Sequence, residues 1–256
     1  MCPSAAWQHY GFSSSEERGV GVKGEKKITF ETVAFYFVLI SLLASAIYSL
    51  INVVSAPTVL DHSGEIEKIK NDYVLMLAQC VLGILVILLP SAVEKRWKIQ
   101  IPSFMHILFT FFLYASIFLG EITQFYYKIP NWDTILHTLS GMMLGTVAFS
   151  VVSLLNQMEK ITLRPLFVAI FAFCFGLALG VVWEIYEFLS DGAMGLNMQK
   201  YALADGTLLI GRAALNDTMV DLIVDALGAF TMAAIGYISL KFNKGWIDKL
   251  LFKKKK

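Results

Sequence analysis

Residues 216–240, NDTMVDLIVDALGAFTMAAIGYISL, form an apolar segment that carries acidic residues near its N-terminal end. Asp217, Asp221 and Asp225 recur every four residues, and Gly228 follows on the same side. This spacing places side chains on one face of a helix. An ionisable side chain inside a membrane span is costly unless it is paired or hydrated, so this face predicts a polar site within the bilayer.

The rest of the chain has the composition of a membrane protein. Of its 256 residues, 57% are apolar and 16% charged, and the mean hydropathy of +0.64 excludes a water-soluble globular domain. A net charge of +1 argues against nucleic-acid binding. Six segments reach the roughly 20 residues that a spanning helix needs. They are residues 33–54, 73–92, 103–120, 134–155, 165–186 and 219–240. We therefore predict an all-α, polytopic integral membrane protein with six transmembrane helices.

The positive charges predict the orientation. Of the 21 lysines and arginines, 16 fall on the side that holds both termini and 5 on the other, so both termini are expected in the cytoplasm. The predicted organisation is a flexible cytoplasmic tail (1–29), a transmembrane domain (30–240) with an extracytoplasmic loop (192–216), and a basic cytoplasmic tail (241–256). The closing lysine run, 253–256, suits an anchor to lipid headgroups or a receptor-read retention signal.

Two further helices carry polar residues at the outer end and glycines deeper in the span. The fourth segment has Asp133, His137, Gly141 and Gly145, and the fifth has Gly176, Gly180, Glu184 and Glu187. Because neighbouring spans alternate in direction, all these acids fall at one depth near the extracytoplasmic side. Small residues at this spacing let helix backbones approach closely. We therefore predict three helices packed through their glycines, with an acidic cup formed by Asp133, His137, Glu184, Glu187, Asp217, Asp221 and Asp225.

The charge of the acidic cup restricts its chemistry. The spans contain no basic residue to neutralise it, and Arg212, just before the sixth helix, is the nearest candidate counter-ion. Such a cluster must protonate, hold water or bind a cation. The candidate metal ligands are Asp133, His137, Glu184, Asp221 and Asp225. His137 and Glu187 are the candidate catalytic groups. Carboxylates with one imidazole suit Mg²⁺, Mn²⁺, Ca²⁺ or Zn²⁺ as the cofactor.

Several of these residues also have structural interpretations. Asn216-Asp217-Thr218 is typical of a helix N-terminus, which predicts that Asp217 caps the sixth helix. His137 could make a structural hydrogen bond to Glu184 instead of binding a metal. Glu187 could lie in the headgroup layer as a solvated helix end.

Three motifs resemble a known family. They are Asp133-xxx-His137-xxx-Gly141, then Trp183-Glu184-Ile185-Tyr186-Glu187, then the segment 216–229 that opens the sixth helix. Together they resemble the bacterial YjdF-type inner-membrane family, whose function is unassigned. The last two motifs more distantly resemble VanZ-like proteins, which are linked to glycopeptide resistance. The resemblance covers about residues 110–240 and implies a location in the bacterial plasma membrane.

Three classes of function are compatible with the sequence. In the first, the acidic cup holds a divalent cation that acts on a lipid or lipid-linked envelope precursor. The second is a proton- or cation-coupled transporter, for which the inner halves of the last three helices offer only hydroxyls such as Ser150 and Thr231. The third is a non-catalytic membrane scaffold. Membrane lipids are the expected partners in each case, and the oligomeric state stays open.

Overall fold

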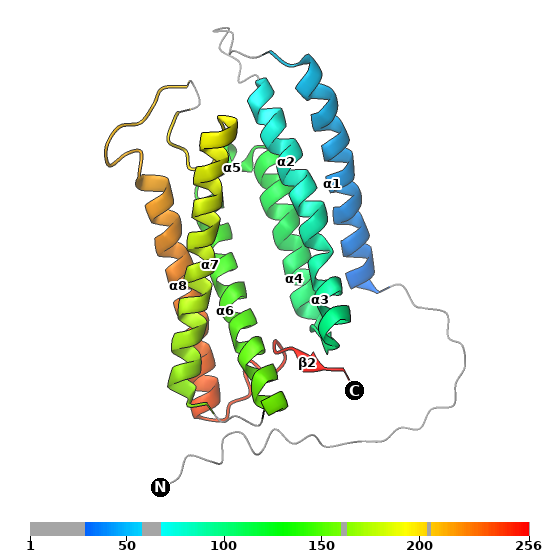
Figure 1. Cartoon of the computed structure of the whole chain (residues 1–256), viewed down its shortest axis with the longest axis vertical. Helices are drawn as coiled ribbons and strands as arrows, with labels where there is room; N and C mark the ends of the chain where they lie inside the picture. Colours follow the sequence, from blue (N-terminus) through cyan, green and yellow to red (C-terminus); the bar gives the residue numbers. More distant parts are fainter. Residues whose placement is uncertain (1–28, 58–67, 160–162, 204–205, 256) are drawn as a thin grey trace, which may run out of the picture.

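The protein is almost entirely helical. The computed structural model describes residues 29–57, 68–159, 163–203 and 206–255. Their elements are α1 (Phe30–Ser55), α2 (Lys70–Ile87), α3 (Leu89–Trp97), β1 (Ile99–Gln100), α4 (Ser103–Leu113), the π-helix η2 (Tyr114–Ile122), α5 (Phe125–Lys128), α6 (Trp132–Glu159), α7 (Pro165–Met194), α8 (Asn216–Lys241) and β2 (Lys253–Lys254). Figure 1 shows the long helices running side by side.

The six predicted spans are confirmed. Six helical stretches in the described part of the chain are long and apolar enough to cross a membrane. The second breaks into α2 and α3 at Leu88, because Pro90 lacks the N–H that would continue the helix. The third continues from α4 into the π-helix η2. The predicted flexible tail lies outside the described residues except for Thr29, and the predicted cytoplasmic location of the termini remains a prediction.

The helices form two groups (Figure 1). In one, α1 and α2 pack with α4 and η2 around a core that includes Leu42, Cys80 and Leu113. In the other, α6, α7 and α8 pack together around Phe149, Ala172 and other apolar side chains. Hydrogen bonds between described residues join the groups. The Trp132 indole N–H donates to the carbonyl of Ala115 at 3.2 Å, and the Asn71 amide donates to the carbonyl of Gly195 at 3.1 Å.

The prediction that α6, α7 and α8 pack through glycines is confirmed. A side chain at Gly228 would meet the backbone of α6 at Thr138 and Met142, and one at Gly141 would meet the backbone of α8 at Asp225. A side chain at Gly176 would lie 2.9 Å from Cβ of Ala229. The glycines therefore allow these helix backbones to lie in contact.

The connection between α7 and α8 folds over one end of this group, which we call the loop end (Figure 1). α7 continues past the predicted boundary to Met194 and ends at Gly195, whose φ of 65° is in the left-handed region. The Asp191 carboxylate accepts hydrogen bonds from the backbone N–H groups of Met198 and Gln199, at 2.8 and 3.0 Å. These bonds fix the first turn of the connection against α7.

The predicted basic tail is folded over its described part, up to residue 255. Ile247 is 1% exposed and belongs to the core of the α6–α8 group. The chain then crosses to the other helix group, where β2 pairs antiparallel with β1 (Figure 1). The tail therefore joins the two groups at the end opposite the loop end.

Candidate functional site

His137 lies at the centre of the acidic cup, one turn into α6. Its Nδ1 is 3.2 Å from Oδ2 of Asp225 on α8, and its Nε2 is 3.7 Å from Oδ1 of Asp133 and 3.9 Å from Oδ2 of Asp221. The Ser140 hydroxyl donates to the other oxygen of Asp225 at 2.9 Å. Asp225 therefore orients the ring, and Nε2 faces two further carboxylates.

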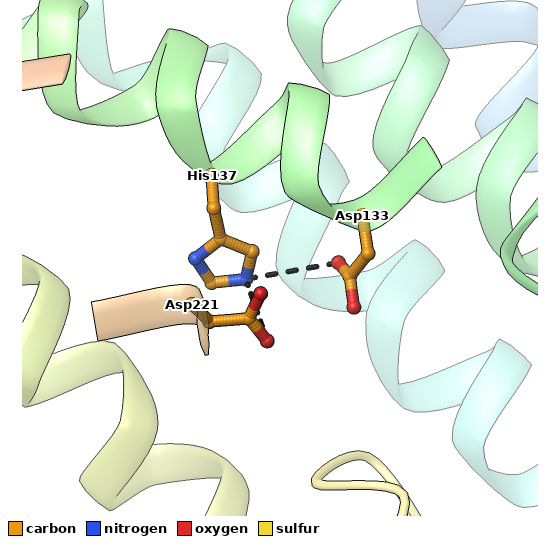
Figure 2. A group of neighbouring side chains, drawn as sticks. All are labelled: Asp133, His137 and Asp221. Carbon is orange, nitrogen blue, oxygen red and sulfur yellow. Dashed lines mark ion pairs between the residues drawn. The ribbon is translucent and has the colours of Figure 1, made fainter. Parts of the chain in front are cut away.

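Three of the predicted ligands meet at that nitrogen. One atom each from Asp133, His137 and Asp221 lies within 4.8 Å of the other two. Figure 2 shows these side chains turned toward one another, with Asp133 and His137 on α6 and Asp221 on α8. His137 and Asp221 are buried and Asp133 is partly exposed. This arrangement can offer one nitrogen and two oxygens to a single ion.

A lysine from the α7–α8 connection closes the cluster. The Lys200 ammonium pairs with Asp133 and lies 2.8 Å from Oδ1 of Asp217, above the ring of Tyr126. Burial alone would lower the pKa of Lys200, but the carboxylates of Asp133 and Asp217 raise it above its usual range. Burial also raises the pKa of the Tyr126 phenol well above its usual value. The site is therefore bordered by a protonated lysine and a neutral tyrosine.

Glu184 reaches the site from α7 but stands apart from the group of three. It is 4% exposed, and its Oε2 accepts a hydrogen bond from the Gln199 side chain at 3.2 Å. The same Gln199 amide donates to the hydroxyl of Thr218 on α8 at 2.9 Å. The second oxygen, Oε1, is buried and has no hydrogen-bond partner in the described part of the chain. A buried carboxylate oxygen in this state is an available acceptor for water or a cation.

Glu187 lies one turn further along α7. It is buried, and its Oε1 accepts a hydrogen bond from the indole N–H of Trp183 at 2.8 Å. Trp183 is itself 40% exposed. The structural interpretation of Glu187 as a solvated helix end is therefore wrong.

Two other expectations are corrected by the geometry. Asp217 does not cap α8, because the cap position is Leu215 and makes no side-chain hydrogen bond; Asp217 pairs with Lys200 instead. The hydrogen-bond partner of His137 is Asp225 rather than Glu184. Asp217 begins the first turn of α8, and its second oxygen, Oδ2, lacks a partner among the described residues.

Lys200, Gln199 and Ser140 are the site residues that sequence reasoning missed. Lys200 and Arg212 are the two basic residues between α7 and α8, and sequence proximity to α8 favoured Arg212 as counter-ion. In the structure Arg212 is exposed, and Lys200 makes the ion pairs. A lysine in this connection was the sequence signal for a counter-ion near the acidic cup. The position of that lysine depends on the hydrogen bonds by which Asp191 holds the loop.

Fold and site together define a multi-pass helical membrane protein with a buried carboxylate–imidazole cluster at one end of a three-helix group. Residues 65–242 match the family described as "Predicted membrane protein (DUF2238)", and the chain belongs to that family. The resemblance to the YjdF-type family is thereby confirmed.

A relative from Thermotoga maritima carries the description "Uncharacterized protein". It is 30% identical over 149 residues, which cover 58% of this chain and 69% of the relative. No solved structure matches the chain.

Proposed function

We propose that this protein binds a divalent cation in the outer leaflet of the bacterial plasma membrane and acts there on a lipid or lipid-linked envelope substrate. The position of His137 is the main support for this proposal. Its Nδ1 is held by Asp225, and its Nε2 faces Asp133 and Asp221. In many metal sites a carboxylate on one ring nitrogen orients the other nitrogen toward the ion.

The roles of the residues follow from this arrangement. Asp133, Asp221 and Nε2 of His137 are the proposed ligands, and Asp225 positions the imidazole. Glu184 offers Oε1, which has no hydrogen-bond partner among the described residues, as a further oxygen. Two carboxylates and an imidazole suit Zn²⁺ or Mn²⁺, and added water or carboxylate oxygens would also accommodate Mg²⁺ or Ca²⁺.

The surroundings suit an amphipathic substrate. A cavity of about 310 Å³ beside the site is lined by Lys200 and Asp217 together with the apolar side chains of Leu203 and Leu209. Ile210 in the same connection is 87% exposed. A lipid can therefore place its polar headgroup near the acidic cup while its chains contact apolar side chains.

The chain's own groups then perform distinct tasks. Lys200 can pair with an anionic headgroup once it leaves Asp133. Glu187, buried within the cup, is the proposed proton donor or acceptor. A bound cation would polarise a phosphate or carbonyl oxygen of the substrate.

The test of the activity uses the full chain in nanodiscs made from bacterial envelope lipids. With Mn²⁺ or Mg²⁺ present, we expect the protein to convert a phosphate-bearing lipid. Mass spectrometry of the lipid extract measures the conversion. The conversion should disappear on chelation and in Asp221→Asn. If wild-type protein with stoichiometric bound cation converts no lipid in the extract, the proposed activity is wrong and the cation site has another use.

Lys200 gives a separate prediction. Its ammonium neutralises Asp133 and Asp217, so it competes with a cation for Asp133. Lys200→Met should therefore tighten Mn²⁺ binding on the order of tenfold, since the pair is partly exposed and screened. Calorimetry measures the change. Lys128→Met is the control, because the Lys128 ammonium donates to the backbone carbonyl of Thr123 and lies outside the cup. Weaker binding in Lys200→Met would contradict the competition.

Cation-coupled transport is the second candidate. Both polar atoms of the Asn156 side chain, near the other end of α6, are buried without a hydrogen-bond partner in the described chain. However, Thr146 and Ser150, between Asn156 and the cup, donate to backbone carbonyls of their own helix. Solute uptake into proteoliposomes that requires a pH gradient and Asp225 would favour this candidate over the enzyme.

A further inference from the structure

A second polar cavity lies at the end of the protein opposite the acidic cup. It has a volume of about 500 Å³ and is lined by Ser91, Glu94, Lys95, Lys98 and Lys255. Four of these residues come from α3 and the residue that follows it, and the fifth comes from the C-terminal tail. We call this cavity the tail pocket.

The pairing of the tail with β1 builds the tail pocket. β2 lies antiparallel to β1, with Lys254 opposite Ile99, and the backbone N–H of Lys255 donates to the carbonyl of Lys98 at 2.8 Å. Lys98 closes α3 in the left-handed conformation, with φ of 53°. Backbone contacts therefore place Lys98 and Lys255 at one cavity although 157 positions separate them in the sequence.

The tail pocket has an excess of positive charge. Its single acid, Glu94, is already engaged, because it accepts hydrogen bonds from the backbone N–H of Ile101 at 2.6 Å and from Lys255 at 3.3 Å. Lys95 and Lys98 make no ion pair with any residue that the structure describes. Three lysines and one glutamate line the pocket, and the net positive charge favours an anionic ligand.

The surface beside the tail pocket is apolar. Leu88 precedes Ser91 by three residues and Lys95 by seven, so these three share one face of the helix. Leu88 and Leu89 are 46% and 55% exposed, and Trp97 at the end of α3 is 66% exposed. In a spanning helix this order of side chains runs from the acyl-chain region to the headgroup region.

We propose that the tail pocket binds the phosphate headgroup of an anionic glycerophospholipid. Lys95, Lys98 and Lys255 contact the phosphate, Ser91 donates a hydrogen bond, and the acyl chains lie along Leu88 and Leu89. A free phosphate ion shares the headgroup chemistry but would gain nothing from the two leucines. The proposal is independent of the cation site, which lies at the loop end.

The experiment is native mass spectrometry of the full chain. The protein is equilibrated in detergent micelles that contain equal amounts of phosphatidylglycerol and phosphatidylethanolamine, and the lipid that stays bound after release from the micelle is identified. Wild-type protein should retain phosphatidylglycerol with a preference on the order of tenfold. Lys95→Gln/Lys98→Gln should reduce the preference to near one. Lys244→Gln/Lys249→Gln is the matched control. It removes two exposed lysines of the C-terminal tail that do not line the cavity.

Each result decides the proposal. Loss of the preference in the cavity variant but not in the control supports it. Equal loss in both variants would show a general surface-charge effect and overturn it, as would a wild-type protein without any preference. A competition with inorganic phosphate separates the two anion sources: displacement of the lipid by phosphate at equal concentration would replace the headgroup assignment with a free-anion site.

Discussion

His137→Ala is expected to weaken divalent-cation binding at least about a hundredfold, because it removes the nitrogen ligand that the other residues surround. Asp221→Asn should have an effect of similar size, since the amide keeps the shape of the side chain but loses its charge. Calorimetric titration of purified protein with Mn²⁺ or Zn²⁺ measures both. If either variant binds the cation with the wild-type affinity, the assignment of these ligands is wrong.

Asp225→Asn serves as the internal comparison. Asp225 contacts the opposite ring nitrogen of His137 and the hydroxyl of Ser140, so its loss should disturb the orientation of the ring without removing a ligand. We expect binding about tenfold weaker, clearly less than in His137→Ala. His106→Ala is the negative control, because His106 faces Glu31 and Glu94, away from the cup.

Gly228→Ala is expected to destabilise the helix group by about 2–3 kcal/mol. The new methyl would press on the α6 backbone at Thr138 and lie 3.1 Å from the backbone nitrogen of Met142. Backbone atoms cannot rotate away, so α6 and α8 must separate. Unfolding in mixed micelles, followed by circular dichroism, measures the loss.

Gly192→Ala is the matched control for this prediction. A methyl there would meet no heavy atom within 4 Å, and alanine favours a helix by up to about 1 kcal/mol over glycine. The control should therefore be neutral or slightly stabilising. If both substitutions destabilise equally, close packing at Gly228 is not what holds α6 and α8 together.

The number of spans and the convergence of the polar residues were predictable from the sequence. Apolar segments of about 20 residues must be helical in lipid, and the four-residue spacing of Asp133 with His137 and of Asp221 with Asp225 assigns each pair to one helix face. The glycines at 141 and 228 indicated close packing, and the structure places them against the backbones of the neighbouring helices.

The details of the site depended on information that helix periodicity does not contain. Lys200 reaches Asp133 because the chain after α7 turns back over the bundle, held by hydrogen bonds to Asp191. Periodicity assigns a residue to a helix face but does not determine where a connection crosses that face. For the same reason the sequence could not distinguish Asp225, on Nδ1 of His137, from Asp221, which faces Nε2.

The fold of the basic tail was likewise not predictable from helix periodicity. The lysine run suggested a basic tail that anchors to lipid headgroups or is read by a receptor, and it gave no sign that Ile247 inserts into the core and Lys255 pairs with Glu94. The apolar residues that pack the tail against the core, Ile247, Leu250 and Leu251, span only five positions, which is too short a stretch for periodicity to predict a packed element. Only their contacts with other elements show that the segment is folded.

The proposed function requires one divalent cation bound between α6 and α8. The most direct measurement is anomalous diffraction from crystals of the full chain grown with Mn²⁺. We expect one strong peak within about 2.0–2.3 Å of Nε2 of His137 and of carboxylate oxygens from Asp133 and Asp221, with Lys200 displaced from Asp133. An acidic cup without a peak at saturating Mn²⁺, with Lys200 still paired to Asp133, would contradict it.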